Sequence, residues 1–158
     1  MKDEVTSNLY ERIVAQMPEA VIFADRDGLI RLWNRGAEVV FGYAAAEVVG
    51  KSLDIIIPDD LRARHWDGYR QAVSAGRTRL GDRALPTKAV RKARQQIYVE
   101  LSFAVIRSEA GAVIGALAVG RNITEKYGQD KALRRRLAEL EKANAALSQH
   151  SSSGDVPG

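Results

Sequence analysis

The stretch "AVIFADRDGLIRLWN", residues 20–34, decides the fold. It contains two β-rich runs, residues 20–25 and 29–33, that meet around Asp27 and Gly28. An Asp-Gly pair supplies the positive φ angle that a tight hairpin turn requires. The stretch therefore predicts a β-hairpin near the start of a folded domain.

Short helices are predicted directly after the hairpin. The Asn34 side chain can accept a hydrogen bond from a first-turn amide, and Gly42 supplies a left-handed stop. Pro58 suits the first position of a longer helix, and the two aspartates after it favour the helix dipole. The predicted helices cover residues 35–41, 44–50 and 58–76, with a turn over residues 52–57.

Three further strands are predicted in the second half of the domain. Residues 97–106 and 112–123 are long apolar runs joined by a turn, and residues 78–90 form a partner strand that Pro86 interrupts. Proline has no amide donor, so this strand belongs at an edge or a bulge. Two strands, several helices and three strands predict an α+β fold with one five-stranded antiparallel sheet and short helices on one face.

Helical patterns are predicted on both sides of this domain. We expect an N-terminal amphipathic helix over residues 1–17, a domain over residues 18–124, a linker helix over residues 125–148 and a flexible tail over residues 149–158. The linker carries heptad-spaced leucines that predict a coiled coil, with Asn144 at an a position. Those leucines are Leu133, Leu137, Leu140 and Leu147. The alternative is a single helix that lies on the domain.

Composition excludes several kinds of chemistry. The 158 residues include no cysteine, which rules out disulfides, thiolate metal sites and cysteine photoadducts. No apolar run approaches the length of a membrane span, so we expect a cytoplasmic protein with no membrane contact. The net charge of +4 arises from interleaved acidic and basic residues, and we expect no direct nucleic-acid binding. No catalytic motif is present, so we expect no enzyme.

The chain resembles the PAS domains, the small sensor modules of signalling proteins. The resemblance is carried by "MPEAVIFADRDGLIRLWNRGAEVVFGYAAAEVVGKSL" (residues 17–53), "IPDDLRARHWDGYRQAVSAGRT" (57–78) and "GALAVGRNIT" (115–124). It departs from the family at Ala44, where a Ser or Thr would complete a capping box with Glu47. PAS domains bind haem, flavin, small acids or nothing, so the family does not decide the ligand.

The run "RARHWDGY" (residues 62–69) is similar to the helix that carries the proximal histidine in haem-PAS domains of oxygen-sensing histidine kinases. This resemblance implies that His65 is the ligand of a haem iron and that Tyr69 contacts the haem edge. Trp66 is an insertion relative to that pattern and rotates Asp67 by about 100° on a helix. Outside this resemblance, Trp66 could stack on a flavin or close a pocket, but an amphipathic ring is more often found at a domain or dimer surface, and we expect it there.

The same resemblance implies an arginine on the next strand, on the distal side of the haem, that donates a hydrogen bond to bound oxygen. Arg83, within "LGDRAL", is the matching position. Guanidinium is a permanent cationic donor, which suits this task. An apolar wall for the cofactor is expected from Leu80, Leu85, Leu101, Phe103 and Val119, each of which also suits ordinary core packing.

These observations leave three hypotheses about function. The first is a dimeric PAS sensor that binds haem b and responds to oxygen, CO or NO, with a histidine kinase or another signalling protein as partner. The second is a cofactor-free module that assembles partners through its core and its heptad helix. The third is a sensor of flavin (FAD or FMN) or of a small metabolite in the same pocket.

Overall fold

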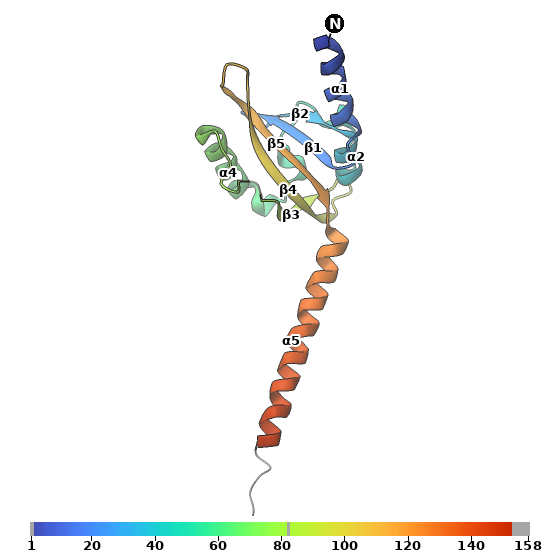
Figure 1. Ribbon diagram of the computed structural model, residues 1–158, viewed down its shortest axis with the longest axis vertical. Helices are drawn as coiled ribbons and strands as arrows, with labels where there is room; N and C mark the ends of the chain where they lie inside the picture. The colour runs from blue at the N-terminus through green and yellow to red at the C-terminus, as the bar shows by residue number, and fades with distance from the viewer. Residues whose placement is uncertain (1, 82, 153–158) are drawn as a thin grey trace, which may run out of the picture. The chain divides into compact units, whose positions relative to one another are not determined.

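The computed structural model describes residues 2–81 and 83–152 and contains one five-stranded antiparallel sheet (Figure 1). The strand order is β2-β1-β5-β4-β3, so the first and last strands of the domain lie side by side at its centre. This confirms the predicted α+β fold. The strands are β1 (Ala20–Asp25), β2 (Ile30–Trp33), β3 (Leu85–Val90), β4 (Gln96–Arg107) and β5 (Val113–Asn122).

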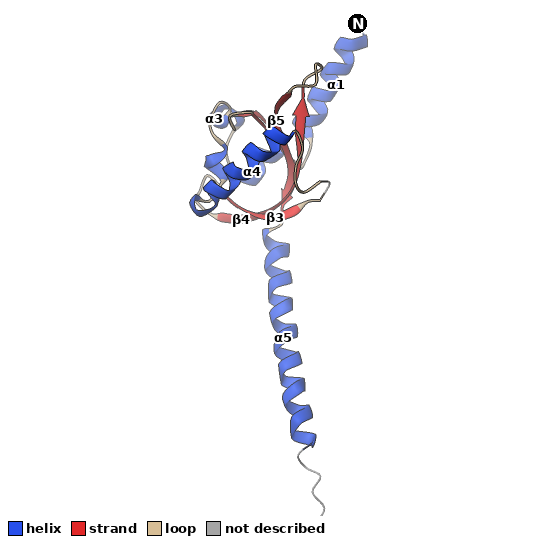
Figure 2. Ribbon diagram, turned by 90° about the vertical axis from the view of Figure 1, so that its left-hand side faces the viewer, coloured by secondary structure: helices blue, strands red, loops and turns tan. Residues whose placement is uncertain are grey.

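Helices pack on one face of this sheet, which we call the inner face. Figure 2 shows α3 and α4 on the same side of the curved sheet. The helical segments before β3 are α1 (Lys2–Gln16), α2 (Arg35–Phe41), α3 (Ala45–Val48), η1 (Leu53–Ile56), η2 (Asp59–Leu61) and α4 (Arg62–Ala75).

The turn chemistry of the hairpin agrees with the prediction. Gly28 has a φ angle of 78°, and the Asp25 carboxylate accepts hydrogen bonds from the amides of Asp27 and Leu29 at 3.0 Å. Burial acts to raise the pKa of Asp25, but the hydrogen bonds from Arg31 and from these amides outweigh it, so the pKa is lowered. The charged carboxylate therefore holds the turn closed.

Strand alternation places the core on the inner face. Ile22 of β1 and Ile97 and Val99 of β4 are buried there with Ile30 and Phe41, which are fully inaccessible to solvent. Successive residues of a strand point to opposite faces, so Val21, Phe23 and Leu117 lie on the other face, which we call the outer face. The outer face is the side that these helices leave uncovered.

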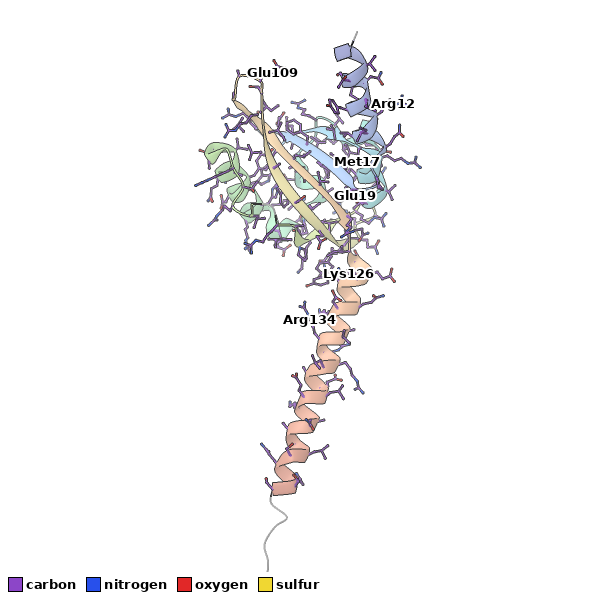
Figure 3. All side chains as sticks on the ribbon, in the orientation of Figure 1. Arg12, Met17, Glu19, Glu109, Lys126 and Arg134 are labelled. Carbon is purple, nitrogen blue, oxygen red and sulfur yellow. The ribbon has the colours of Figure 1, made fainter. Side chains whose placement is uncertain are left out.

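Buried Asn34 connects α1, the sheet and α2. Its Oδ1 accepts hydrogen bonds from the Val21 amide at 2.8 Å and from the Ala37 amide at 2.9 Å, which caps α2. Its Nδ2 donates to the carbonyls of Val14 and Glu19 at 3.0 Å and of Met17 at 3.3 Å. Figure 3 labels Met17 and Glu19 at this junction. One side chain that is 5% exposed thus satisfies five backbone groups.

The third strand begins later than predicted. Residues 79–81 form a turn, and β3 starts only at Leu85. Pro86 lies inside β3, which is an edge strand of the sheet, as the missing amide donor requires. The predicted strand over residues 78–90 is therefore correct only in its second half.

In the second unit, Thr124–Gly158, the described residues form one long helix, α5 (Thr124–Ser152). The helix continues four residues past the predicted boundary at residue 148, so residues 149–152 are helical rather than a tail. The remainder of the predicted tail, residues 153–158, lies outside the described residues. In the parts that the structure describes, no helix has the length and apolarity to cross a bilayer.

We predict that Asn34→Ala lowers the free energy of unfolding by about 1–3 kcal/mol, because buried backbone groups lose their partners. Asn34→Asp is the sharper variant. It keeps the acceptor for Val21 and Ala37, yet it replaces the donor to three carbonyls by a carboxylate oxygen. It should therefore destabilise at least as strongly as alanine at neutral pH. Urea denaturation measures both.

The matched control for this prediction is Asn8→Asp. Asn8 is exposed on α1, so the same chemical change should alter the free energy of unfolding by no more than about 0.5 kcal/mol. Wild-type stability in Asn34→Asp would contradict the role assigned to the Asn34 amide.

Candidate functional site

Helix α4 places three adjacent ring side chains at the inner face of the sheet. The His65 ring lies 4.9 Å from that of Trp66 and 5.9 Å from that of Tyr69, measured between centroids. All three side chains are half-buried, and Trp66 and Tyr69 pack against the hydrophobic core. His65 and Tyr69 are one helical turn apart, which is why they share a face of α4.

Trp66 attaches α4 to the β1–β2 turn. Its ring covers Gly28 so closely that a Cβ built there would lie 2.2 Å from two ring carbons. Its Nε1 donates a hydrogen bond of 2.8 Å to the Asp54 carboxylate in η1. Trp66 is therefore a half-buried anchor that holds α4 to the turn and to η1. Asp67, displaced by this insertion, is exposed and pairs with Arg70.

Tyr69 makes the second attachment. Its hydroxyl donates to the carbonyl oxygens of Ala24 at 3.0 Å and of Asp25 at 2.6 Å, at the end of β1. Burial raises the pKa of Tyr69 to about 12, so the phenol stays neutral and remains a donor. The side chain that was expected to touch a cofactor edge thus also fixes α4 to the hairpin.

His65 differs from both neighbours because one of its ring nitrogens, Nδ1, has no hydrogen-bond partner among the described residues. Nδ1 is buried and forms no hydrogen bond with any residue that the structure describes. Burial lowers the pKa of the imidazole, with a smaller opposing effect from Asp54, so the ring is neutral at physiological pH. A neutral imidazole with an unpaired nitrogen is the form that ligates a metal.

The sheet presents predicted wall residues to the same side. Leu85 pairs with Leu101 across β3 and β4, and Phe103 follows two residues later on the same face. Leu101 is 8% exposed, whereas Phe103 is half-buried and Leu85 is 38% exposed. The structure therefore brings these three residues together on the inner face.

Small residues of β5 complete this surface and were not predicted. Ala118 lies opposite Phe103, and Gly120 lies opposite Leu101. Ala116, two residues before Ala118, has the same orientation, because side chains alternate along a strand. The signal was present in "GALAVGRN" (residues 115–122), where small residues alternate with larger ones.

Val119 lies on the outer face, which corrects its predicted place in the wall. It pairs with Ser102 and Val21, whose side chains point away from Leu101 and Ile22. A shift of one residue along a strand moves a side chain to the opposite face, so the predicted face of Val119 was wrong by one residue.

Val119 instead lines a cavity of about 230 Å³, formed together with Gly81, Ser102, Phe103, Ala104 and Leu117. That volume is below the roughly 300–1,000 Å³ of typical ligand pockets.

The connection between α4 and β3 holds the other two predicted residues. Leu80 is half-buried in the turn, and the Arg83 amide donates to its carbonyl at 3.3 Å. The Arg83 side chain is exposed and precedes β3 rather than lying on it. The structure thus does not bring Arg83 to His65 in the way that the resemblance implied.

The donor set at His65 restricts what kind of metal could bind. Within residues 2–81 and 83–152, no group of three or more His, Asp or Glu side chains is arranged to hold an ion. A single imidazole holds a metal well only when the remaining ligands come with it. Haem meets this condition, because the porphyrin supplies four nitrogens and the protein adds an axial histidine. His65 therefore fits haem better than a bare ion.

Protonation of His65 is predicted to destabilise the fold. The folded pKa lies below the ordinary value of 6.5, so the unfolded chain takes up a proton at a higher pH than the folded chain does. The free energy of unfolding should therefore fall as the pH drops through 6.5 toward the folded pKa. Denaturation at a series of pH values should show this fall in the wild type and in His150→Gln, and a smaller one in His65→Gln.

If His65→Gln keeps the full pH dependence, the titrating group lies elsewhere. The control is well matched because the chain contains only two histidines. His150 lies on exposed α5.

Two curated sensor proteins are similar to parts of the chain. The sensor protein FixL of Bradyrhizobium diazoefficiens is 37% identical over 57 residues, which are 36% of this chain and 11% of FixL. The oxygen sensor protein DosP of Escherichia coli is 23% identical over 132 residues, which are 84% of this chain and 16% of DosP. The chain thus spans less than a fifth of the length of either relative.

Solved structures agree with the fold. An RNA-binding Light-Oxygen-Voltage receptor superposes with a TM-score of 0.69 at 21% identity, over 90% of this chain and 39% of that one. The PAS domain of a protein from Colwellia psychrerythraea gives a TM-score of 0.66 at 20% identity, over 76% and 98%. The model of the PAS fold matches residues 8–123, a span that contains the whole sheet and the helices α2, α3 and α4. The chain therefore belongs to the PAS family.

Proposed function

We propose that this chain is a sensory PAS module that binds haem b, with His65 as the protein ligand of the iron. The observation that carries the proposal is the buried, unpartnered Nδ1 of His65 on the helix that covers the inner face. A buried polar atom without a partner costs free energy, and a ligand bound there would remove that cost.

The surroundings of His65 support this proposal. Leu85, Leu101 and Phe103 offer an apolar surface, and the small residues of β5 leave more room beside it than larger side chains would. When bound, haem would supply reversible binding of a diatomic gas such as oxygen, CO or NO. The curated relatives named above are called a sensor and an oxygen sensor, which agrees with such a role.

Arg83 enters the proposal as the gas-contacting residue. The resemblance to haem-PAS domains is its only support, because its side chain is exposed outside β3. If Arg83 has this role, Arg83→Ala changes the affinity for oxygen without loss of haem.

The attachments of α4 suggest how a signal would leave the site. Trp66 contacts Gly28 in the β1–β2 turn, Tyr69 donates to the carbonyls that end β1, and β1 pairs with β5 along its whole length. β5 ends two residues before α5 begins. A displacement of α4 would therefore reach β5 through β1, and the output would pass to a signalling partner such as a histidine kinase.

A second candidate function is a cofactor-free module that assembles partners. The observation in its favour is the exposed heptad stripe of α5, which needs no ligand. This second function predicts that the chain forms an oligomer whether or not a chromophore is bound.

The test of haem binding is an absorption spectrum of the purified chain after expression with added haemin. We expect a Soret band in the wild type and in His150→Ala, and its loss or a clear shift in His65→Ala. His65→Gly should regain the band when free imidazole is added, since imidazole can replace the missing ligand.

Three outcomes would overturn the haem proposal. They are no Soret band in a folded wild type, an unchanged band in His65→Ala, or a flavin spectrum from the chain as isolated. The last would place FAD or FMN in the site, without a photoadduct, because the chain has no cysteine.

A further inference from the structure

The positive charge of the chain is concentrated at one edge of the sheet. Residues 77–94, which lead from α4 through β3 to the turn before β4, contain seven cationic residues and one acidic residue, a net charge of +6. The whole chain has a net charge of +4, so all its other residues together have a net charge of −2. The modest total, from which we expected no nucleic-acid binding, does not reveal this concentration.

Two of the seven cations have structural roles. Arg91 donates to the Val39 carbonyl at 3.2 Å, and Lys92 pairs with Glu47, so both hold the turn after β3 against the helices. The other five are exposed, and none forms an ion pair or a side-chain hydrogen bond with any residue that the structure describes. These five residues, which we call the basic edge, are Arg77, Arg79, Arg83, Lys88 and Arg94.

We propose that the basic edge binds the phosphate backbone of a double-stranded nucleic acid. This inference goes beyond the proposed haem function and does not depend on it. A duplex has one negative charge per about 1.7 Å of its axis, so it can contact several separated cations at once. The six residues of β3 alone span roughly 20 Å, which corresponds to about six base pairs.

Residue type favours the backbone of a duplex as the partner. Four of the five cations are arginines, whose planar guanidinium group can form two parallel hydrogen bonds with one phosphate. Residues 77–94 contain no Phe, Trp or Tyr on which an unpaired base could stack. Because binding of single strands relies on such stacking, the basic edge suits paired strands, whose phosphates are accessible and whose bases are not.

Protection of the sheet edge explains only part of this charge. Lys88 and Pro86 lie on β3, where a cation and a proline hinder pairing with a strand of another molecule. Arg77 and Arg79 precede β3 and lie in the connection from α4, so they protect no strand. Their charge therefore needs a different explanation, and an anionic partner supplies one.

Fluorescence anisotropy of the full chain with labelled duplexes of about 24 base pairs, one of DNA and one of RNA, tests the proposal. Between about 50 and 200 mM salt, the logarithm of the association constant should fall with the logarithm of salt concentration with a slope of about −4. Arg77→Gln/Arg79→Gln should reduce this slope by about two and weaken binding roughly tenfold at the lower salt. Arg77→Lys/Arg79→Lys should keep the slope, because it keeps the charge.

The matched control is Arg134→Gln/Arg135→Gln, which removes the same charge from exposed positions of α5, where Figure 3 labels Arg134. It should bind within about twofold of the wild type, because both arginines lie outside the basic edge. Arg83 is unchanged in every variant because it also enters the haem proposal. The Soret band therefore tests haem binding separately, and either proposal can fail alone.

Several results would overturn the proposal. They include no binding to either duplex at protein concentrations up to about 100 µM, equal weakening in the α5 control, or an unchanged salt slope in Arg77→Gln/Arg79→Gln. Tighter binding to polyglutamate than to either duplex would indicate an acidic protein as the partner instead. Binding to vesicles that contain phosphatidylserine, without binding to a duplex, would indicate a membrane surface.

Discussion

The constraint on which this structure most depends is the satisfaction of backbone groups around Asn34. α1 ends at Gln16, β1 begins at Ala20, and Asn34 brings the start of α2 to the same place in the fold; the helix ends there leave amides or carbonyls without partners. A single amide side chain supplies two acceptor contacts and three donor contacts there. Gly36 fits the same junction, because a Cβ at that position would lie 2.1 Å from the Glu19 carbonyl oxygen. Because these backbone groups lie so close together, the end of α1 can adopt few other conformations.

Local sequence signals predicted the hairpin, the cap at Asn34 and the stop at Gly42, because each of these depends on residues a few positions apart. The same signals did not show that Asn34 also binds three carbonyls before β1, since those bonds depend on the path by which α1 enters the fold. The late start of β3 was missed for a similar reason. Composition alone does not show at which residue a turn ends and hydrogen bonding to the neighbouring strand begins.

The candidate site was predicted in part. Residue type and resemblance identified α4 and His65, but long-range packing decided what surrounds them. Trp66 contacts Gly28, 38 positions earlier in the sequence, and Tyr69 bonds to Ala24 across 45 positions. Val119 was placed on the wrong face because the parity of β5 depends on its register with two neighbouring strands. The alternation of side chains along a strand can be recognised in a sequence. Which of the two faces is covered by the helices is decided by packing.

The three ring residues of α4 illustrate how a fold can leave one side-chain atom, here Nδ1 of His65, without a hydrogen bond to the rest of the chain. Trp66 and Tyr69 use their polar atoms on Asp54 and on the carbonyls that end β1, so their positions are fixed by hydrogen bonds and by packing. The His65 ring contacts both of their rings, yet its Nδ1 has no hydrogen bond within the described chain. Rigid neighbours reduce the entropy that a ligand must remove when it orders this side chain. The insertion of Trp66, which departs from the resemblance, thus strengthens the support of His65 rather than displacing it.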